Sequence, residues 1–243
     1  MIRRRVSVAL LVRDAFTGRT FSSGSGTLCT VDGQICAPLW KDGGYLVLTD
    51  LPAGEHTITL RRQGYREETL TVPVADSRAW EGWTGLRPGP GYVFPAGTAW
   101  VYLTLLEKKK PLADAEVWLA PDGGGRLKLA QDQAKAGDQE LRLFYSGVES
   151  RLPVPGDFLI ADQKHPETAA LESMQGGKAR LARPLACGHA RGKELMPAQR
   201  YRTSGDGVCS CVLRESGKLW ILCAGKLSAL DIQLGENRLE VSI

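Results

Sequence analysis

Three histidines are the first side chains to consider for chemistry in this chain of 243 residues. His56 lies within an alternating strand pattern, and His165 precedes a proline in a loop. His189 is two residues from Cys187, which raises a cysteine–histidine pair for nucleophilic catalysis. The glycine-rich surroundings contain no strand-to-helix turn to present a nucleophile, and geometry rather than adjacency defines such a pair. We therefore predict no catalytic residues and no enzyme, with a hydrolase built on residues 146–200 the least favoured function.

Six cysteines could bind a metal or pair with one another. Cys29 and Cys36 could bridge a loop. The other candidate ligands of a zinc ion are Cys187, His189, Cys209, Cys211 and Cys223. Structural zinc sites usually space paired cysteines two to four residues apart, and this set does not match that spacing. Without a secretory signal we expect reduced, partly buried thiols and no metal. Phosphate-loop, dinucleotide and His-Glu-x-x-His motifs do not occur, so we expect no cofactor.

The charge of the chain argues against highly charged partners. Its 31 Lys and Arg against 27 Asp and Glu leave a net charge of +4, which gives no strong case for nucleic acid or a membrane surface. Two basic runs, residues 3–5 and 108–110, flank expected strands, where cations commonly prevent edge-to-edge pairing. Docking to an acidic partner is the alternative for these runs. The triplet 200–202, Arg-Tyr-Arg, is weak evidence for nucleic acid.

The first residues imitate a secretory signal because three arginines precede the apolar run 6–12. That run is short, and Arg13 and Asp14 interrupt it before any small-residue cleavage site, so we expect a first strand with a basic lead-in. Nothing approaches the roughly 20 apolar residues that a membrane-spanning helix requires. We therefore expect synthesis into the cytoplasm and no membrane insertion.

The elements that must position these residues are clearest between residues 42 and 66. Runs 45–51 and 56–61 alternate between apolar and polar residues, and residues 52–54, Pro-Ala-Gly, supply a turn between them. Alternation with a period of two predicts strands with one buried face, so this segment predicts a β-hairpin. The chain up to residue 75 holds about seven short strands, the density expected of a β-sandwich. We expect residues 1–75 to form the first domain.

Residues 76–97 change composition towards tryptophan, proline and glycine. Proline has no amide donor and cannot hold a strand ladder, so we predict an inter-domain linker. Its aromatic side chains would either pack over the hydrophobic core of this chain or contact a partner. The candidate contacts for a protein, or alternatively for a carbohydrate, are Trp80, Trp83, Tyr92 and Trp100.

Residues 98–243 predict a second β-sandwich. Its continuous apolar run 219–223 predicts a fully buried strand, and the glycines of residues 122–125 predict a flexible turn. Alternation fades between residues 146 and 180, where we expect an irregular insertion. Residues 166–175 could form one short helix within it, and nothing else in the sequence predicts a helix.

The hairpin of the first domain also resembles a known family. The residues that carry the resemblance are Asp42-Gly43-Gly44-Tyr45, Leu51-Pro52-Ala53-Gly54-Glu55-His56 and Gly64-Tyr65-Arg66. They resemble the carboxypeptidase regulatory-like module, also called transthyretin-like or prealbumin-like. The resemblance covers residues 6–74, with a fainter echo near 204–213, and residues 22–26 depart from it where members usually carry a proline-led turn. It implies a seven-stranded antiparallel Greek-key sandwich, no catalytic role in most members, and a strand position for His56.

These expectations combine into one prediction. The fold class is all-β, with two antiparallel Greek-key β-sandwich domains, the second carrying an irregular insertion with at most one short helix. The predicted function is that of a non-enzymatic structural or protein-binding module, a component of a larger bacterial or phage-tail-like assembly; that placement is by analogy. A carbohydrate-binding module that uses the linker aromatics is the alternative.

Overall fold

The computed structural model describes residues 4–122, 127–145 and 154–243. Across these residues the chain forms strands and turns and contains no helix, which confirms the all-β fold class. Part of the basic run 3–5, most of the predicted turn 122–125 and the start of the predicted insertion lie outside the described residues. No helix in the described part of the chain is long and apolar enough to cross a membrane.

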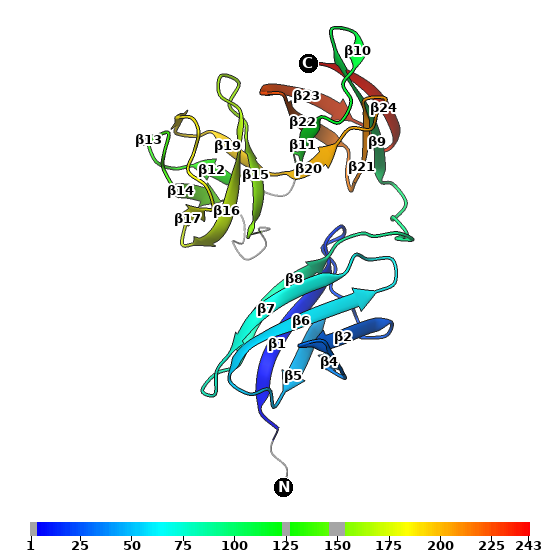
Figure 1. The fold of residues 1–243 in the computed structure, drawn as a ribbon, viewed down its shortest axis with the longest axis vertical. Helices are drawn as coiled ribbons and strands as arrows, with labels where there is room; N and C mark the ends of the chain where they lie inside the picture. Colours follow the sequence, from blue (N-terminus) through cyan, green and yellow to red (C-terminus); the bar gives the residue numbers. More distant parts are fainter. Residues whose placement is uncertain (1–3, 123–126, 146–153) are drawn as a thin grey trace. The chain divides into compact units, whose positions relative to one another are not determined.

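The chain divides into two compact units, Met1–Pro95 and Ala96–Ile243. Unit 1 contains two four-stranded sheets, ordered β4-β5-β1-β8 and β3-β2-β6-β7 (Figure 1). The first sheet consists of β1 (Val6–Asp14), β4 (Leu39–Lys41), β5 (Tyr45–Thr49) and β8 (Trp80–Leu86). The second consists of β2 (Thr27–Val31), β3 (Gln34–Cys36), β6 (Gly54–Arg62) and β7 (Glu68–Val74). Their inward side chains form one core, with Leu10, Leu46, Ile58 and Leu60 fully buried.

Strand β8 lies in the range that the sequence predicts to be a linker. It pairs in parallel with β1, with Trp83 opposite Leu11 and Leu86 opposite Asp14. Thr84 and Leu86 are buried, because alternate residues of β8 face the core of unit 1. The prolines of residues 76–97, which predicted a linker without strand pairing, all lie after residue 86, so they do not interrupt β8.

Unit 2 contains a second pair of sheets. In one, β9 (Ala99–Glu107) pairs with β10 (Lys110–Pro111), β21 (Val208–Leu213) and, in parallel, β24 (Gly235–Ser242). The other has the order β20-β11-β22-β23, formed by Gln199–Arg202, Glu116–Pro121, Gly217–Cys223 and Lys226–Ile232. A shared core includes Val101, Leu103, Val117 and Ile221, all fully buried. The apolar run 219–223 is the buried part of the central strand β22.

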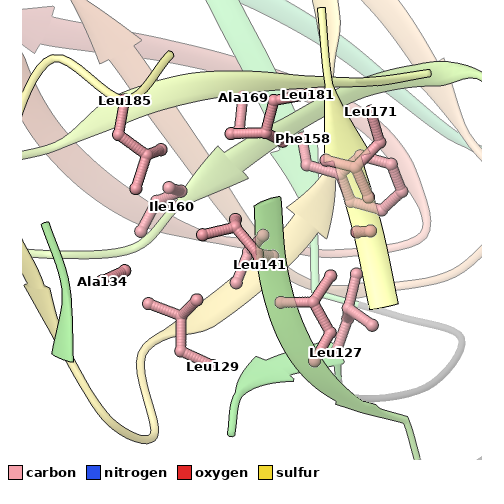
Figure 2. Close-up of a cluster of buried hydrophobic side chains, with 13 residues drawn as sticks. Leu127, Leu129, Ala134, Leu141, Phe158, Ile160, Ala169, Leu171, Leu181 and Leu185 are labelled. Carbon is pink, nitrogen blue, oxygen red and sulfur yellow. The ribbon is translucent and has the colours of Figure 1, made fainter. Parts of the chain in front are cut away.

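A closed barrel is inserted into this second pair of sheets, between β11 and β20. Its order is β12-β14-β17-β16-β15-β19, formed by Leu127–Leu129, Glu140–Tyr145, Lys178–Leu181, Glu167–Gln175, Gly156–Ile160 and Glu194–Pro197. A short ribbon of β13 (Gln133–Ala134) and β18 (His189–Ala190) accompanies it. Figure 2 shows leucines from several of its strands in one cluster with Ile160 and Phe158, and Phe158 is fully buried.

The barrel corrects two expectations for the insertion. The described part of residues 146–180 is regular and belongs to a barrel that begins at Leu127 and ends at Pro197. The segment predicted to be a helix is strand β16, which pairs with β15 on one side and β17 on the other. Ala169 and Leu171 are buried in the barrel core. Tertiary pairing has overridden the weak local helix preference of this segment.

Candidate functional site

A buried polar cluster surrounds His189, the histidine that the sequence singles out beside Cys187. The His189 side chain is 0% exposed. Its Nδ1 lies 3.3 Å from Oδ2 of Asp162, and its Nε2 lies 2.6 Å from Oε1 of Glu167. Lys193 Nζ donates to the other oxygen of Asp162 at 3.0 Å. The cluster therefore places one imidazole of the β13–β18 ribbon between two carboxylates, one of them on the barrel strand β16.

The carboxylates of this cluster also bind the backbone. Glu167 accepts hydrogen bonds from the amides of Ala186 at 2.8 Å and Cys187 at 2.9 Å. Burial alone would raise the pKa of Asp162, but hydrogen bonds from Lys193, the Lys164 amide and His189 hold it at about 2.

This geometry bears directly on the cysteine–histidine pair. A histidine that activates a thiol must offer one ring nitrogen to that thiol. Both ring nitrogens of His189 already face carboxylate oxygens. The backbone amide of Cys187 is bound to Glu167. The arrangement clamps a loop onto strand β16, and it leaves no imidazole nitrogen to take a proton from Cys187.

The other histidines do not extend this cluster. His56 lies in β6 and is 8% exposed. Its Nδ1 contacts Oδ2 of Asp32 at 2.7 Å, and its Nε2 contacts the carbonyl of Pro52 at 2.9 Å. The hydrogen bond to Asp32, followed by that to Pro52, raises the pKa of His56. His165 lies in the loop between β15 and β16.

A second buried carboxylate organises one end of unit 1. Asp14 ends strand β1 and is 7% exposed. Its Oδ1 accepts the amides of Phe16 at 2.7 Å and Thr17 at 3.0 Å. Its Oδ2 accepts the hydroxyls of Tyr65 at 3.0 Å and Tyr92 at 2.6 Å. Burial, then the charge of Asp14, raises the pKa of Tyr65 to about 12.

The four aromatic residues predicted to contact a partner have different surroundings. Trp80 packs against the core of unit 1. Tyr92 binds Asp14 and meets Phe16 edge-to-face, with ring centroids 6.0 Å apart. Trp83 is half-buried beneath the guanidinium of Arg13, which lies 3.8 Å from the centre of its ring. Trp100 belongs to unit 2 and is 40% exposed.

Trp83 belongs to a surface that the sequence alone does not reveal. It lies opposite Leu11, and Leu11 lies opposite Tyr45. In the next row Ala9 lies opposite Val47, and Val47 opposite Leu39. We call this surface of the β4-β5-β1-β8 sheet the outer apolar face; its members are Ala9, Leu11, Leu39, Tyr45, Val47 and Trp83. Tyr45 is 43% exposed and Leu39 is 40% exposed, whereas Val47 is buried and the other three members are half-buried.

A groove of about 1020 Å³ is lined by residues of β14, β16 and β17. Arg142 lies directly opposite Lys178 in its wall, next to the pair of Glu140 and Arg180. Like charges placed opposite each other on neighbouring strands are destabilising. In the described part of the chain no carboxylate forms an ion pair with Arg142 or Lys178.

The C-terminal cysteines lie in the core of the second pair of sheets. Cys209 and Cys211 share the buried face of β21, and Cys223 ends β22. Burial raises the pKa of Cys209 to about 11 and that of Cys211 to about 12. The described residues contain no group of three or more histidine, cysteine or acidic side chains that could hold a metal ion.

Comparisons with known proteins identify no family. No family model matches the sequence, and no curated protein matches it. Similar solved structures include the Bacillus anthracis TIE protein, 11% identical with a TM-score of 0.28; the match covers 98% of this chain and 33% of that one.

Two pilins are also among the similar solved structures. The minor pilin GBS52 of Streptococcus agalactiae is 12% identical with a TM-score of 0.28, and 98% of this chain and 94% of that one are covered. The major pilin BcpA of Bacillus cereus is 8% identical with a TM-score of 0.27, and 99% of each chain is covered. At such scores the likenesses carry no argument, and the carboxypeptidase regulatory-like resemblance stays a prediction.

Proposed function

We propose that this chain is a non-enzymatic structural or protein-binding module, a component of a larger bacterial or phage-tail-like assembly. The observation that carries the proposal is the outer apolar face of unit 1. Exposed apolar patches on a folded domain commonly mark interaction sites. Tyrosine, tryptophan and arginine are enriched at protein interfaces, and this face carries Tyr45 on one side of Leu11 and Trp83, with Arg13 over its ring, on the other.

The partner that fits this face is another protein subunit. Its contact surface would carry apolar side chains to cover Leu39 and Tyr45, with polar groups at the margin. Lys41 and Glu81 pair with Tyr45 and Ala9 at the two sides of the face, which supplies a charged margin of both signs. A hydrophobic centre with a polar rim is the usual anatomy of such contacts.

The structural role of the chemistry-bearing residues also supports the proposal. His189 is enclosed by two carboxylates, and Asp14 is engaged by four donors. Perturbed titratable groups occur at structural networks as well as at active sites. In both clusters the groups join separate segments of the chain, which is a stabilising role.

The test compares two substitutions of exposed aromatic residues in the full chain, expressed in its native cell. Tyr45→Lys places a charge within the outer apolar face. Phe144→Lys is the matched control, because Phe144 is 60% exposed on strand β14 of the barrel. We expect wild type and Phe144→Lys to elute in a high-mass complex whose cross-links map to β1, β5 and β8. Tyr45→Lys should elute alone with an unchanged melting temperature.

Three outcomes would contradict parts of this proposal. Retention of Tyr45→Lys in the complex would show that the outer apolar face is not the contact. Glycan-array binding that is lost on Trp83→Ala would favour the carbohydrate-binding alternative. Hydrolysis of generic ester or peptide substrates that is lost on Cys187→Ala would overturn the non-enzymatic assignment.

A further inference from the structure

Cys29 and Cys36 occupy opposed positions on the β2–β3 hairpin. The turn between the strands consists of Asp32 and Gly33, with φ values of 51° and 79°. Positive φ at both central residues is the requirement of the two-residue hairpin turn that matches strand twist. This turn fixes the register, so Cys29 pairs directly with Cys36.

The two sulfur atoms are already in contact. The Sγ atoms of Cys29 and Cys36 are 3.3 Å apart. Directly opposed residues in an antiparallel pair have Cα atoms about 4.5–5.5 Å apart, within the range of about 4.4–6.8 Å found for disulfides. A bond length of about 2.05 Å requires the sulfur atoms to approach by roughly 1.3 Å more. Small side-chain rotations supply such a movement without a change of register.

The two cysteines differ in access to solvent. Cys29 is 1% exposed in the core of unit 1, and burial raises the pKa of its thiol. Cys36 is half-buried on β3, a three-residue strand at the edge of its sheet. Cys36 also lines a cavity of about 250 Å³ together with Ile35 and Leu39. A small reagent can therefore reach Cys36, whereas Cys29 is buried and inaccessible to it.

We propose that Cys29 and Cys36 form a reversible intrachain disulfide when the chain meets a small-molecule disulfide oxidant. The Cys36 thiolate attacks one sulfur of the oxidant R–S–S–R, forming a mixed disulfide and releasing one RS⁻. The Cys29 sulfur then attacks Sγ of Cys36, forming the Cys29–Cys36 bond and releasing the second RS⁻. The two cysteine protons end on the two released thiols. Two cysteines are oxidised, and one oxidant is reduced to two thiols.

The Cys29–Cys36 disulfide would link the edge strand β3 covalently to its neighbour β2. Strand β2 pairs with β6 as well as with β3, so the bond ties β3 to the centre of its sheet. Closing a loop removes conformations from the unfolded chain, and closing the loop from Cys29 to Cys36 should raise the melting temperature of unit 1 by about 10–20 °C. The oxidised protein should therefore be the more heat-resistant form of unit 1.

The test uses the full chain and oxidised glutathione as the probe. After incubation the protein is denatured, its free thiols are alkylated, and its intact mass is measured. Wild type has six cysteines, and we expect two of them to escape alkylation until dithiothreitol is added. Peptide mapping should join Cys29 to Cys36. Wild type that keeps all its thiols alkylatable, or a cross-link between other cysteines, would overturn the proposal without any variant.

Variants then assign the two steps. In Cys29→Ala we expect glutathione to stay attached to Cys36, because no second thiol displaces it. In Cys36→Ala we expect every remaining thiol to be alkylated. Cys187→Ala is the matched control, since Cys187 is also half-buried but lies in unit 2, and it should still lose two thiols. An unmodified Cys36 in the Cys29→Ala protein would refute attack by Cys36.

Discussion

Replacing Asp14 tests whether one carboxylate holds the end of unit 1 together. The substitution Asp14→Ala removes an acceptor that is engaged by two backbone amides and two tyrosine hydroxyls. Asp14 is 7% exposed, so water cannot replace these interactions fully. We expect the hydroxyls of Tyr65 and Tyr92 to be left without their acceptor.

The cost follows from the number and quality of these bonds. A hydrogen bond to a charged group contributes about 1.5–3 kcal/mol, and bonds that share one group are not additive. The tyrosine rings keep their edge-to-face packing, which limits the loss. We expect Asp14→Ala to lower the free energy of unfolding of unit 1 by about 4 kcal/mol. Tyr92→Phe should cost about 2 kcal/mol, because it removes the shorter hydroxyl bond alone.

Hydrogen exchange of the full chain resolves unit 1 from unit 2, so it is the appropriate assay. Exchange is followed for peptides from β1 and β8 in wild type, both single variants and the double variant. The two substitutions should couple by about 2 kcal/mol, since each removes the same bond. A spectroscopic readout is independent: in Asp14→Asn the pKa of Tyr65 should fall from about 12 towards its ordinary 10. Additive losses, or a cost below about 1 kcal/mol for Asp14→Ala, would refute the reasoning.

Three further predictions concern other parts of the chain. The pKa of His56 is raised in the folded state, so its ion pair with Asp32 stabilises unit 1 fully below about pH 6.5, and this stabilisation is lost as pH rises through the folded-state pKa. The pKa of Asp32 is lowered, first by the Thr57 amide and then by His56. The contribution of Asp32 is therefore lost as pH falls below 3.8 and through its folded-state pKa. Melting temperatures against pH should show this window, and His56→Asn should remove it. Lys178→Glu should stabilise the barrel by about 0.5 kcal/mol in urea unfolding, because it places an acid opposite Arg142, and a destabilised variant would refute this. Phe158→Ala should cost about 4 kcal/mol, with faster exchange in β15 and β16 as the readout, since Phe158 is fully buried; unchanged exchange would contradict it.

Strands with regular alternation could be predicted from the sequence, and topology could not. The patterns of residues 45–51 and 56–61 correspond to β5 and β6. In β6 alternate residues are buried, whereas β5 buries Leu46, Val47 and Leu48 in succession. Residues 167–175 contain alanine, leucine, glutamate and methionine, which favour helices in isolation. Their strand conformation depends on β15 and β17, which bury Ala169 and Leu171. No local signal records that pairing.

The buried polar clusters could be predicted in part. His56 and His189 stand out in the sequence, but the acids that bind them do not. Asp32 is 24 residues from His56, and Asp162 is 27 residues from His189. Separations of this size become contacts only through the arrangement of the sheets. The dipeptide Asp32-Gly33 is itself a local signal for a two-residue hairpin turn, and it places Asp32 at a strand end.

The acids of these clusters share one physical role: each binds backbone amides as well as side chains. Asp14, Asp32, Asp162 and Glu167 each accept at least one backbone amide, in addition to any side-chain partner. Buried amides that no strand ladder pairs are costly, and a carboxylate satisfies them more strongly than a neutral acceptor does. A β protein with many short strands has many such amides at its turns and strand ends. Acids at these positions also bind histidine, lysine and tyrosine side chains. Such a cluster has the composition of an active site, and its interactions join separate segments of the chain. The outer apolar face is the surface on which the proposed partner-binding role is best tested.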